Sequence, residues 1–348
     1  MSAALTLDKK TIALVLDFDH TLTEETQQAP VFRKYWDNIV KFYSKPKNMA
    51  KIKAKFPDFS GFHGPEDYFA MKDTEDYGEG VGWLQRFVWD WNNGLFPGLT
   101  PEKLIETGKN IQLSPGLPEF FPAFKEKWAK EDIDVKFYVV SVGLKELIQG
   151  SPIAPYLDDI FASRIIADGF PHNGDEPVYG IGDVMTPYGK TETSYIIRKG
   201  SQELRDRQMN PEEYAIYSYK HIIGFGDGMS DRPFFSHHFK RGSQMVAVYP
   251  EGDWNAFKKT VANVGTRVNY VLPRNYSPDG DLFKSIDDIV KLMLNDKCLM
   301  SPYDLHQYKS GEITDPEKIE YVEKHLDKCD RCSMYTTLHQ IPPKRIIS

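Results

Sequence analysis

Two aspartates near the start of the chain have the type and spacing of a reactive, cation-binding pair. Asp17 and Asp19 lie in the segment DFDHT, directly after the apolar run at residues 12–16. A carboxylate is a competent covalent nucleophile. Two carboxylates this close also repel each other, and a divalent cation would relieve the repulsion. The alternative is an exposed acidic turn, which the strongly apolar preceding run disfavours.

A second pair of carboxylates follows another apolar run. Asp227 and Asp231 lie in the segment GDGMSD, just after residues 222–225. The glycines of this segment permit a tight turn and a close approach of the backbone to a ligand. Carboxylates repeated beyond an apolar run favour a cation site over a simple acidic turn.

Two further polar residues are weaker signals when taken singly. Ser141 ends the apolar run at residues 135–140, where a serine is equally compatible with a helix N-cap. Lys190 opens a predicted helix, where a single lysine is usually a solvated side chain.

The apolar runs indicate the elements that must position these residues. They show no alternation, as expected for strands buried on both faces of a parallel sheet. Helical stretches such as 117–130 and 191–199 separate the predicted strands, which are residues 12–16, 135–140, 160–166, 222–225, 245–249 and 268–272. This order predicts an α/β fold with a Rossmann-like, doubly wound parallel sheet. Ligands of such sheets bind beyond the carboxyl ends of the strands.

The segment between the first two predicted strands differs from the rest, because it contains no strong buried-strand run. We predict a mostly helical insertion at residues 25–112. The α/β core would then consist of residues 1–24 and 113–285, and a separate C-terminal module of residues 286–348.

Aromatic residues within the insertion have two interpretations. Trp83, Phe87 and Trp91 recur at helical spacing on one face, and Trp89 lies off that face. Such a stripe usually packs in a core. The alternative is a face that closes over an apolar or aromatic part of a substrate.

In their order along the chain, the four polar segments resemble the four motifs of the haloacid dehalogenase (HAD) superfamily of phosphohydrolases. Residues 17–21 are similar to the first motif, DxDx[TV], and residues 226–231 to the fourth, GDxxxD. Ser141 and Lys190 resemble the second and third motifs. The segments SVGLKEL and GFGDGMSD are most similar to the phosphoserine-phosphatase-like branch, in which a helical cap occupies the place of the insertion.

The resemblance implies an Mg²⁺-dependent phosphomonoester hydrolase that acts on a small phosphorylated substrate. Asp17 would be the nucleophile that forms an aspartyl-phosphate, and Asp19 would be the general acid and base. Mg²⁺ would be held by Asp17, the backbone carbonyl of Asp19, and Asp227. Dehalogenases of the superfamily do not have the second aspartate of the first motif, so the presence of Asp19 disfavours carbon–halogen cleavage.

The remaining motif residues would bind the phosphoryl group and support the metal. Ser141 and Lys190 would bind phosphoryl oxygens, and Asp231 would support the metal site or pair with Lys190. The charges agree with this interpretation, because anionic Asp17 repels a phosphate dianion unless Mg²⁺ and Lys190 offset its charge.

Two other functions fit the same residues. A phosphotransferase would pass the phosphoryl group to an acceptor other than water. A regulatory binding protein would sense a phosphorylated ligand through the HAD-like core and hold a protein partner through the C-terminal module.

The C-terminal region contains a candidate second metal site. His325, Cys329 and Cys332 have the spacing H-x3-C-x2-C, and the third cysteine of the chain is Cys298. These four side chains would suffice for a closed, structural Zn²⁺ site. His306 competes with Cys298 for the fourth position. The alternative is three ordinary thiols and a surface histidine.

Residues 298–335 resemble the zinc-finger module at the start of zinc-binding anti-sigma factors. This resemblance rests on the pattern Cys…His-x3-Cys-x2-Cys and on the segment HLDKC. Attachment after a HAD-like core departs from the usual setting of that family, so sigma-factor binding is not implied.

The composition is that of a globular protein with enough apolar material for a sizeable core. The 348 residues are 41% hydrophobic and 27% charged, which excludes a disordered or collagen-like chain. The net charge of -7 disfavours nucleic-acid binding. We also expect no membrane span, signal peptide or disulfide framework, and hence a cytoplasmic protein.

Overall fold

A seven-stranded sheet forms the centre of the molecule, with the strand order β4-β3-β2-β1-β5-β6-β7. The structure is a computed structural model that describes residues 11–65, 67–68, 81–167, 177–209, 213–216, 218–295, 305, 308–311, 313–314 and 316–327. The strands are β1 (Thr11–Leu16), β2 (Asp134–Leu144), β3 (Asp159–Ala167), β4 (Tyr179–Asp183), β5 (Ile222–Gly226), β6 (Gln244–Tyr249) and β7 (Tyr270–Pro273). Neighbouring strands are parallel, except that β3 and β4 are antiparallel. The predicted α/β fold with a doubly wound, mainly parallel sheet is confirmed.

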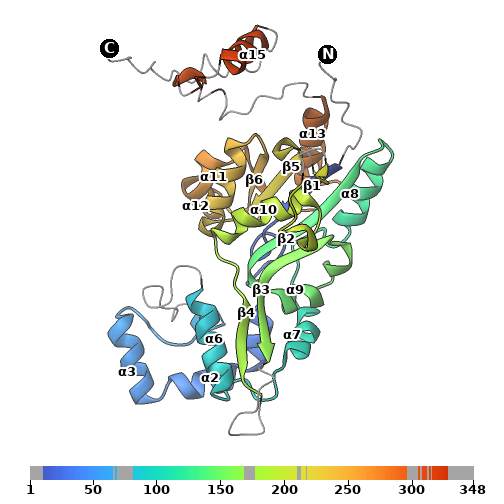
Figure 1. Cartoon of the computed structure of the whole chain (residues 1–348). Coiled ribbons are helices and arrows are strands. Elements are labelled where there is room, and N and C mark those ends of the chain that lie inside the picture. The colour runs from blue at the N-terminus through green and yellow to red at the C-terminus, as the bar shows by residue number, and fades with distance from the viewer. Residues whose placement is uncertain are drawn as a thin grey trace, which may run out of the picture.

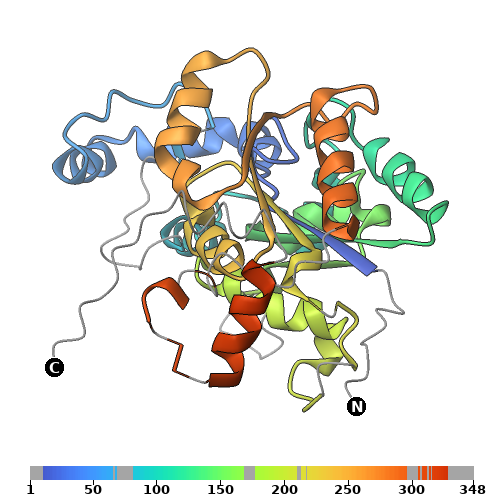
Figure 2. The ribbon, with the colours of Figure 1, turned by 90° about the horizontal axis from the view of Figure 1, so that it is seen from above.

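Helices cover both faces of this sheet (Figures 1 and 2). The helices of the described residues, including those of the insertion, are α1 (Ala29–Lys34), α2 (Trp36–Tyr43), α3 (Pro46–Lys55), α6 (Gly82–Asn92), α7 (Pro101–Gly108), α8 (Phe120–Ala129), α9 (Lys145–Gly150), α10 (Gly189–Lys199), α11 (Arg232–Lys240), α12 (Trp254–Val264), α13 (Asp281–Asn295) and α15 (Pro316–Leu326). Short 3-10 helices are η1 (Ala154–Tyr156), η2 (Gln202–Leu204), η4 (Tyr219–His221), η5 (Met229–Asp231) and η6 (Gly265–Arg267).

Strand β1 explains why the predicted strands show no alternation. Its even-numbered residues, such as Leu14, belong to a core cluster that also contains side chains of α8, α9 and α13. Its odd-numbered residues Ala13 and Val15 belong to a second cluster with side chains of α10, α11 and α12. Both faces of the strand are therefore covered by helices and must be apolar.

Two features of the sheet differ from the prediction. Strand β4 has the sequence Tyr-Gly-Ile-Gly-Asp, and its glycines and short length leave no apolar run to detect. Strand β2 does not end at Ser141 but continues to Leu144, and its pairing with β3 shifts register between these two residues. Ser141 is therefore part of an irregular strand end and does not cap a helix.

The chain leaves the sheet for the helical insertion and returns to it at adjacent positions. The Ser114 amide donates to the Leu22 carbonyl (2.9 Å), and the Glu24 amide donates to the Gln112 carbonyl (2.9 Å). Thr23 and Leu113 form a β-bridge between them. We call residues 22–24 and 112–114 the neck. Helices α1, α2, α3, α6 and α7 lie between these two segments in the sequence, so the described part of the insertion is mostly helical.

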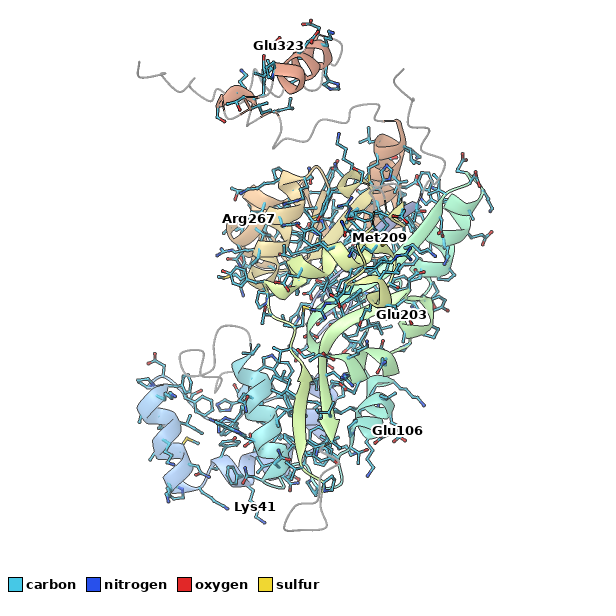
Figure 3. The ribbon with its side chains drawn as sticks, viewed as in Figure 1. Lys41, Glu106, Glu203, Met209, Arg267 and Glu323 are labelled. Carbon is cyan, nitrogen blue, oxygen red and sulfur yellow. The ribbon has the colours of Figure 1, made fainter. Side chains whose placement is uncertain are left out.

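The aromatic stripe of α6 packs inside the insertion, which confirms the core interpretation. Trp83, Phe87 and Trp91 are between 0% and 6% exposed, whereas Trp89 is 43% exposed. Trp91 stacks on Tyr179 of β4 with ring centres 4.2 Å apart. The β3–β4 hairpin thus extends from the sheet to support the insertion (Figure 1). Charged side chains such as Lys41 lie on its outer surface (Figure 3).

The core extends beyond the boundary predicted at residue 285. Helix α13 runs across this position, and its residues Ile286 and Ile289 are buried in the main core cluster. Helix α15 contains His325, and its Val322 packs with Leu305 and Leu326. Cys298, His306, Cys329 and Cys332 lie outside the described residues, so the zinc site stays a prediction. None of the described helices combines the length and apolarity needed to span a bilayer.

Candidate active site

A buried lysine joins two of the predicted aspartates. Lys190 Nζ lies 2.6 Å from Asp17 Oδ1 and 2.7 Å from Asp231 Oδ1. The three side chains are between 1% and 6% exposed. Burial lowers the pKa of Lys190, but the charges of Asp17 and Asp231 outweigh it and raise this pKa above its ordinary value. The lysine is therefore a permanent cation and not the solvated side chain of the alternative interpretation.

Strand register brings these residues together. Leu16 of β1 lies opposite Val139 of β2 on one side and Phe225 of β5 on the other. The amide of Asp17 continues the pairing by donating to the Phe225 carbonyl (3.1 Å). The carboxyl ends of β1 and β5 therefore meet at Asp17, with Asp227 just beyond β5 and Ser141 in the irregular last part of β2.

Asp231 is held with both carboxylate oxygens engaged. Oδ1 accepts from Lys190, and Oδ2 accepts from the amides of Asp227 and Gly228 at 3.2 Å each. A β-carbon at Gly226 would lie 2.3 Å from Asp231 Oδ2, so this close approach requires glycine at position 226. The arrangement fits Asp231 as the residue that positions Lys190 and the turn carrying Asp227.

The carboxylates match the needs of a hard divalent cation. Oxygen atoms of Asp17, Asp227 and Asp231 all lie within 4.8 Å of one another. Burial, followed by repulsion from Asp231, raises the pKa of Asp17 and of Asp227 from 3.8 to about 7 despite the opposing charge of Lys190. Mg²⁺ favours one or two carboxylates together with waters and substrate oxygens. With Asp231 engaged elsewhere, Asp17 and Asp227 are the carboxylates best suited to hold it.

Asp19 has the environment of a proton donor. Burial and the neighbouring charge of Asp17 raise its pKa from 3.8 to about 7, although hydrogen bonds from Gln27 oppose the shift. The amide of Gln27 donates to Asp19 Oδ1 at 2.8 Å. A carboxyl group with a pKa near 7 can give and take a proton at neutral pH.

Ser141 is fully buried at the irregular end of β2. Its Oγ accepts from the Gly143 amide (3.0 Å) and faces Gln27 Nε2 at 3.4 Å. Because both contacts use the oxygen as acceptor, the hydroxyl hydrogen can point to a third group. This is the orientation needed to donate to an anionic ligand.

Two residues of the site were not predicted from the sequence. Gln27 contacts both Asp19 and Ser141. Arg274 follows β7, is 3% exposed, and donates from Nη1 to the His20 carbonyl at 2.5 Å. It supports His20, whose φ of 55° is left-handed and turns the chain directly after Asp19. Gln27 lies well beyond the apolar run at 12–16, and Arg274 is a single basic residue after the predicted strand at 268–272, so no local pattern of carboxylates marks either residue.

A buried hydrogen-bond network ties the helix of Lys190 to the helix after Asp231. Ser243 Oγ donates to the Tyr219 carbonyl (2.6 Å), so it must accept from His238 Nδ1 at 3.2 Å. Burial keeps the pKa of His238 well below its ordinary value, so the ring is neutral and its Nε2 is an acceptor. Ser194 Oγ of α10 donates to this nitrogen at 2.6 Å. The network fixes α10 against α11.

No protein-family model matches the chain. An uncharacterized protein of Borreliella burgdorferi is 25% identical over 294 residues, which cover 79% of this chain and 95% of that protein.

Among solved structures, a phosphoserine phosphatase with a phospho-aspartyl intermediate analogue matches at 18% identity and a TM-score of 0.42, over 80% of this chain and 99% of its own. A substrate-bound phosphoserine phosphatase matches at 18% identity and a TM-score of 0.44, over 81% and 99%. A probable phosphoserine phosphatase from Vibrio cholerae matches at 14% identity and a TM-score of 0.43, over 84% and 68%.

We predict that Asp227→Asn stabilises the metal-free protein more as pH rises. Folded Asp227 releases its proton near pH 7, whereas an unfolded aspartate releases it near 3.8. Between these values the folded state holds a proton that the unfolded state has lost, so this group lowers the free energy of unfolding as pH increases. Asparagine does not titrate, so the advantage of the variant should grow from about pH 4 to about pH 7 and then level off.

Urea unfolding of both proteins in a chelator, at several pH values, measures this difference. A constant or shrinking advantage of Asp227→Asn across that range would contradict the prediction. Saturating Mg²⁺ should reverse the order of stability, because it stabilises only a folded state that can hold it.

We also predict that Ser194→Ala lowers the free energy of unfolding by about 1–3 kcal/mol, because it leaves buried His238 Nε2 without its donor. Thr191→Val on the same helix is the matched control. Its buried Oγ1 has no hydrogen-bond partner, so this change should alter stability by less than about 0.5 kcal/mol. Urea unfolding measures both effects, and equal effects would speak against the network.

Proposed function

We propose that the protein is an Mg²⁺-dependent phosphomonoester hydrolase of the HAD type, acting through an aspartyl-phosphate on Asp17. The observation that carries this proposal is the buried Lys190 held between Asp17 and Asp231, beside Asp227 and an Asp19 with a raised pKa. Nucleophile, cation, acid and metal-holding carboxylates are then present in one place. A simple acidic turn would need neither a buried lysine nor a shared carboxylate.

The nucleophilic step follows from the orientation of Asp17. Its Oδ1 is held by Lys190, which leaves Oδ2 to attack the phosphorus atom of the substrate. The bond between phosphorus and the ester oxygen breaks as the new bond to Oδ2 forms. Asp19 gives its proton to the departing ester oxygen, so the leaving group departs as a neutral alcohol.

Hydrolysis of the aspartyl-phosphate uses the same residues, with the direction of proton transfer at Asp19 reversed. Asp19, now ionised, takes a proton from a water molecule, whose oxygen attacks the phosphorus atom. Inorganic phosphate leaves and Asp17 is restored as a carboxylate. Ser141 and Lys190 donate to the phosphoryl oxygens and hold the group in position during both steps.

Asp17, Asp227 and the backbone carbonyl of Asp19 would hold the Mg²⁺. When bound, the ion supplies positive charge that offsets repulsion between the carboxylates and a phosphate dianion. Lys190 alone does not offset this repulsion, because Asp17 and Asp231 already share its charge.

Replacement of the two aspartates of the first motif should separate their roles. Asp17→Asn should bring turnover of p-nitrophenyl phosphate below detection with Mg²⁺ present, because an amide is a poor nucleophile. Asp19→Asn should lower turnover of an ester with a poor leaving group by roughly 10²–10⁴-fold. Phosphate release measures both, and mass spectrometry of acid-quenched enzyme detects the aspartyl-phosphate.

Asp279→Asn, outside the site, controls for the change of a carboxylate. Substantial turnover by purified Asp17→Asn would refute the covalent mechanism. Release of phosphate to an added alcohol in preference to water would identify a phosphotransferase instead.

We further propose that residues after the core form a module with a structural Zn²⁺ site made of Cys298, His325, Cys329 and Cys332, with His306 as the competing fourth ligand. What supports this is the spacing of the ligands, and helix α15, which carries His325 and extends to Leu326. A closed site with four protein ligands would be structural and not catalytic. Any protein partner would bind at this module.

Protein purified without added metal should therefore contain about one zinc per chain, since four ligands complete one closed site. Elemental analysis measures the zinc. Cys329→Ser should lower it, and comparison of Cys298→Ser with His306→Ala identifies the fourth ligand. A zinc-free protein whose three thiols all react rapidly with a thiol reagent would rule the site out.

A further inference from the structure

Gln27 occupies an unusual position for a residue of the insertion. It lies shortly after the neck, is 0% exposed, and forms hydrogen bonds to three different parts of the site. Its amide donates to Asp19 Oδ1 (2.8 Å), and its Nε2 faces Ser141 Oγ (3.4 Å). Its Oε1 accepts from the amide of Leu144 at 3.0 Å. The side chain thus extends from the base of the insertion into the irregular end of β2.

The backbone of β2 is shaped to admit this side chain. A β-carbon at Gly143 would lie 1.7 Å from Gln27 Nε2, so any other residue at position 143 would displace the side-chain amide group of Gln27. Gly143 also donates its own amide to Ser141 Oγ. The serine hydroxyl therefore lies between two donors, one from each side of the neck.

These contacts determine how the two reactive groups present their hydrogens. Because the backbone amide of Gln27 donates to Asp19 Oδ1, the transferable proton of Asp19 is directed to Oδ2. Because Ser141 Oγ faces donors from Gly143 and Gln27, its hydrogen is directed to a third acceptor. One residue thereby orients both the proton donor and a phosphate-binding group.

We propose that Gln27 is a positioning residue for the acid Asp19 and for the phosphate-binding Ser141. This inference rests on the proposed hydrolase function. The side chain anchors Gln27 to β2, and the anchored backbone then holds its amide against Asp19. Misplacement of a reacting group by about 1 Å can cost about 10²-fold in rate.

The chemistry of glutamine is specific here, which makes Gln27→Glu informative. A glutamate of the same shape could still accept from the Leu144 amide, but its second oxygen could not donate to Ser141. The serine hydrogen would turn toward that carboxylate and away from the phosphoryl group. We therefore expect Gln27→Glu to raise KM for p-nitrophenyl phosphate about tenfold, the effect of losing one charge-assisted hydrogen bond.

Gln27→Met removes both side-chain hydrogen bonds at similar volume and frees the amide that orients Asp19. Its effect should depend on the leaving group. With Mg²⁺ present, kcat/KM for phenyl phosphate, whose leaving oxygen needs a proton, should fall about tenfold further than for p-nitrophenyl phosphate, which needs none. A merely structural loss would lower both values equally.

Gln28→Met is the matched control. Gln28 is the next residue, is 2% exposed, and its Oε1 has no hydrogen-bond partner, so the same substitution there should leave the ratio of the two substrates unchanged. Gly143→Ala should reproduce the pattern of Gln27→Met with residue 27 intact. Thermal melting verifies that each variant is folded. If Gln27→Met does not fold, the isosteric Gln27→Glu and its predicted rise in KM test the role of Gln27 instead.

The outcomes separate this inference from the proposed function. A wild-type protein that hydrolyses neither ester with Mg²⁺ would refute the proposed function. If the wild-type protein hydrolyses both esters, the role of Gln27 alone would be overturned by a folded Gln27→Met variant that loses activity equally on both esters or retains it in full. An unchanged KM in Gln27→Glu would likewise overturn it. A selective loss on phenyl phosphate in Gln27→Met, absent in Gln28→Met, is the expected result.

Discussion

The ammonium group of Lys190 lies between carboxylates supplied by two other parts of the chain, with all three groups removed from water. Taking such charges out of water costs several kcal/mol per ion, and only mutual attraction with good hydrogen-bond geometry offsets that cost. The strand order places β5 beside β1, and the network through His238 holds α10 against α11. Much of the core can be understood as the frame that keeps this lysine and its two partners in register.

The same cluster has a chemical consequence. Asp17, Asp227 and Asp231 bring three carboxyl groups to one ammonium group, and burial, followed by repulsion from Asp231, raises the pKa of Asp17 and of Asp227. The site is therefore electrostatically incomplete without a further cation. Under the proposed function, the affinity for a metal and the affinity for a phosphate dianion would be parts of one charge balance.

The sequence predicted best where chemistry and burial leave a local pattern. Unbroken apolar runs predicted strands such as β1 and β5, and the carboxylates directly after these runs, Asp17 and Asp227, lie together as expected. Strand β4 was not predicted because it has no apolar run of its own. It is stabilised by pairing with β3 and by the stacking of Trp91 on Tyr179. Gln27 and Arg274 escaped because a glutamine or an arginine becomes part of a site only through contacts made after folding, which no spacing rule contains.

The neck between the insertion and the sheet also bears on how the molecule can fold. Parallel strands β1 and β2 are separated in sequence by the whole insertion, and such distant pairs form slowly because a long loop must close first. The hydrogen bonds between residues 22–24 and 112–114 bring that loop's ends together near its base. Once they form, β1 is joined to β2 through residues 17–22 and 114–133 only, a crossover of ordinary length that contains α8. The effective contact order of the sheet then becomes that of an uninterrupted α/β protein, whatever helices the insertion contains.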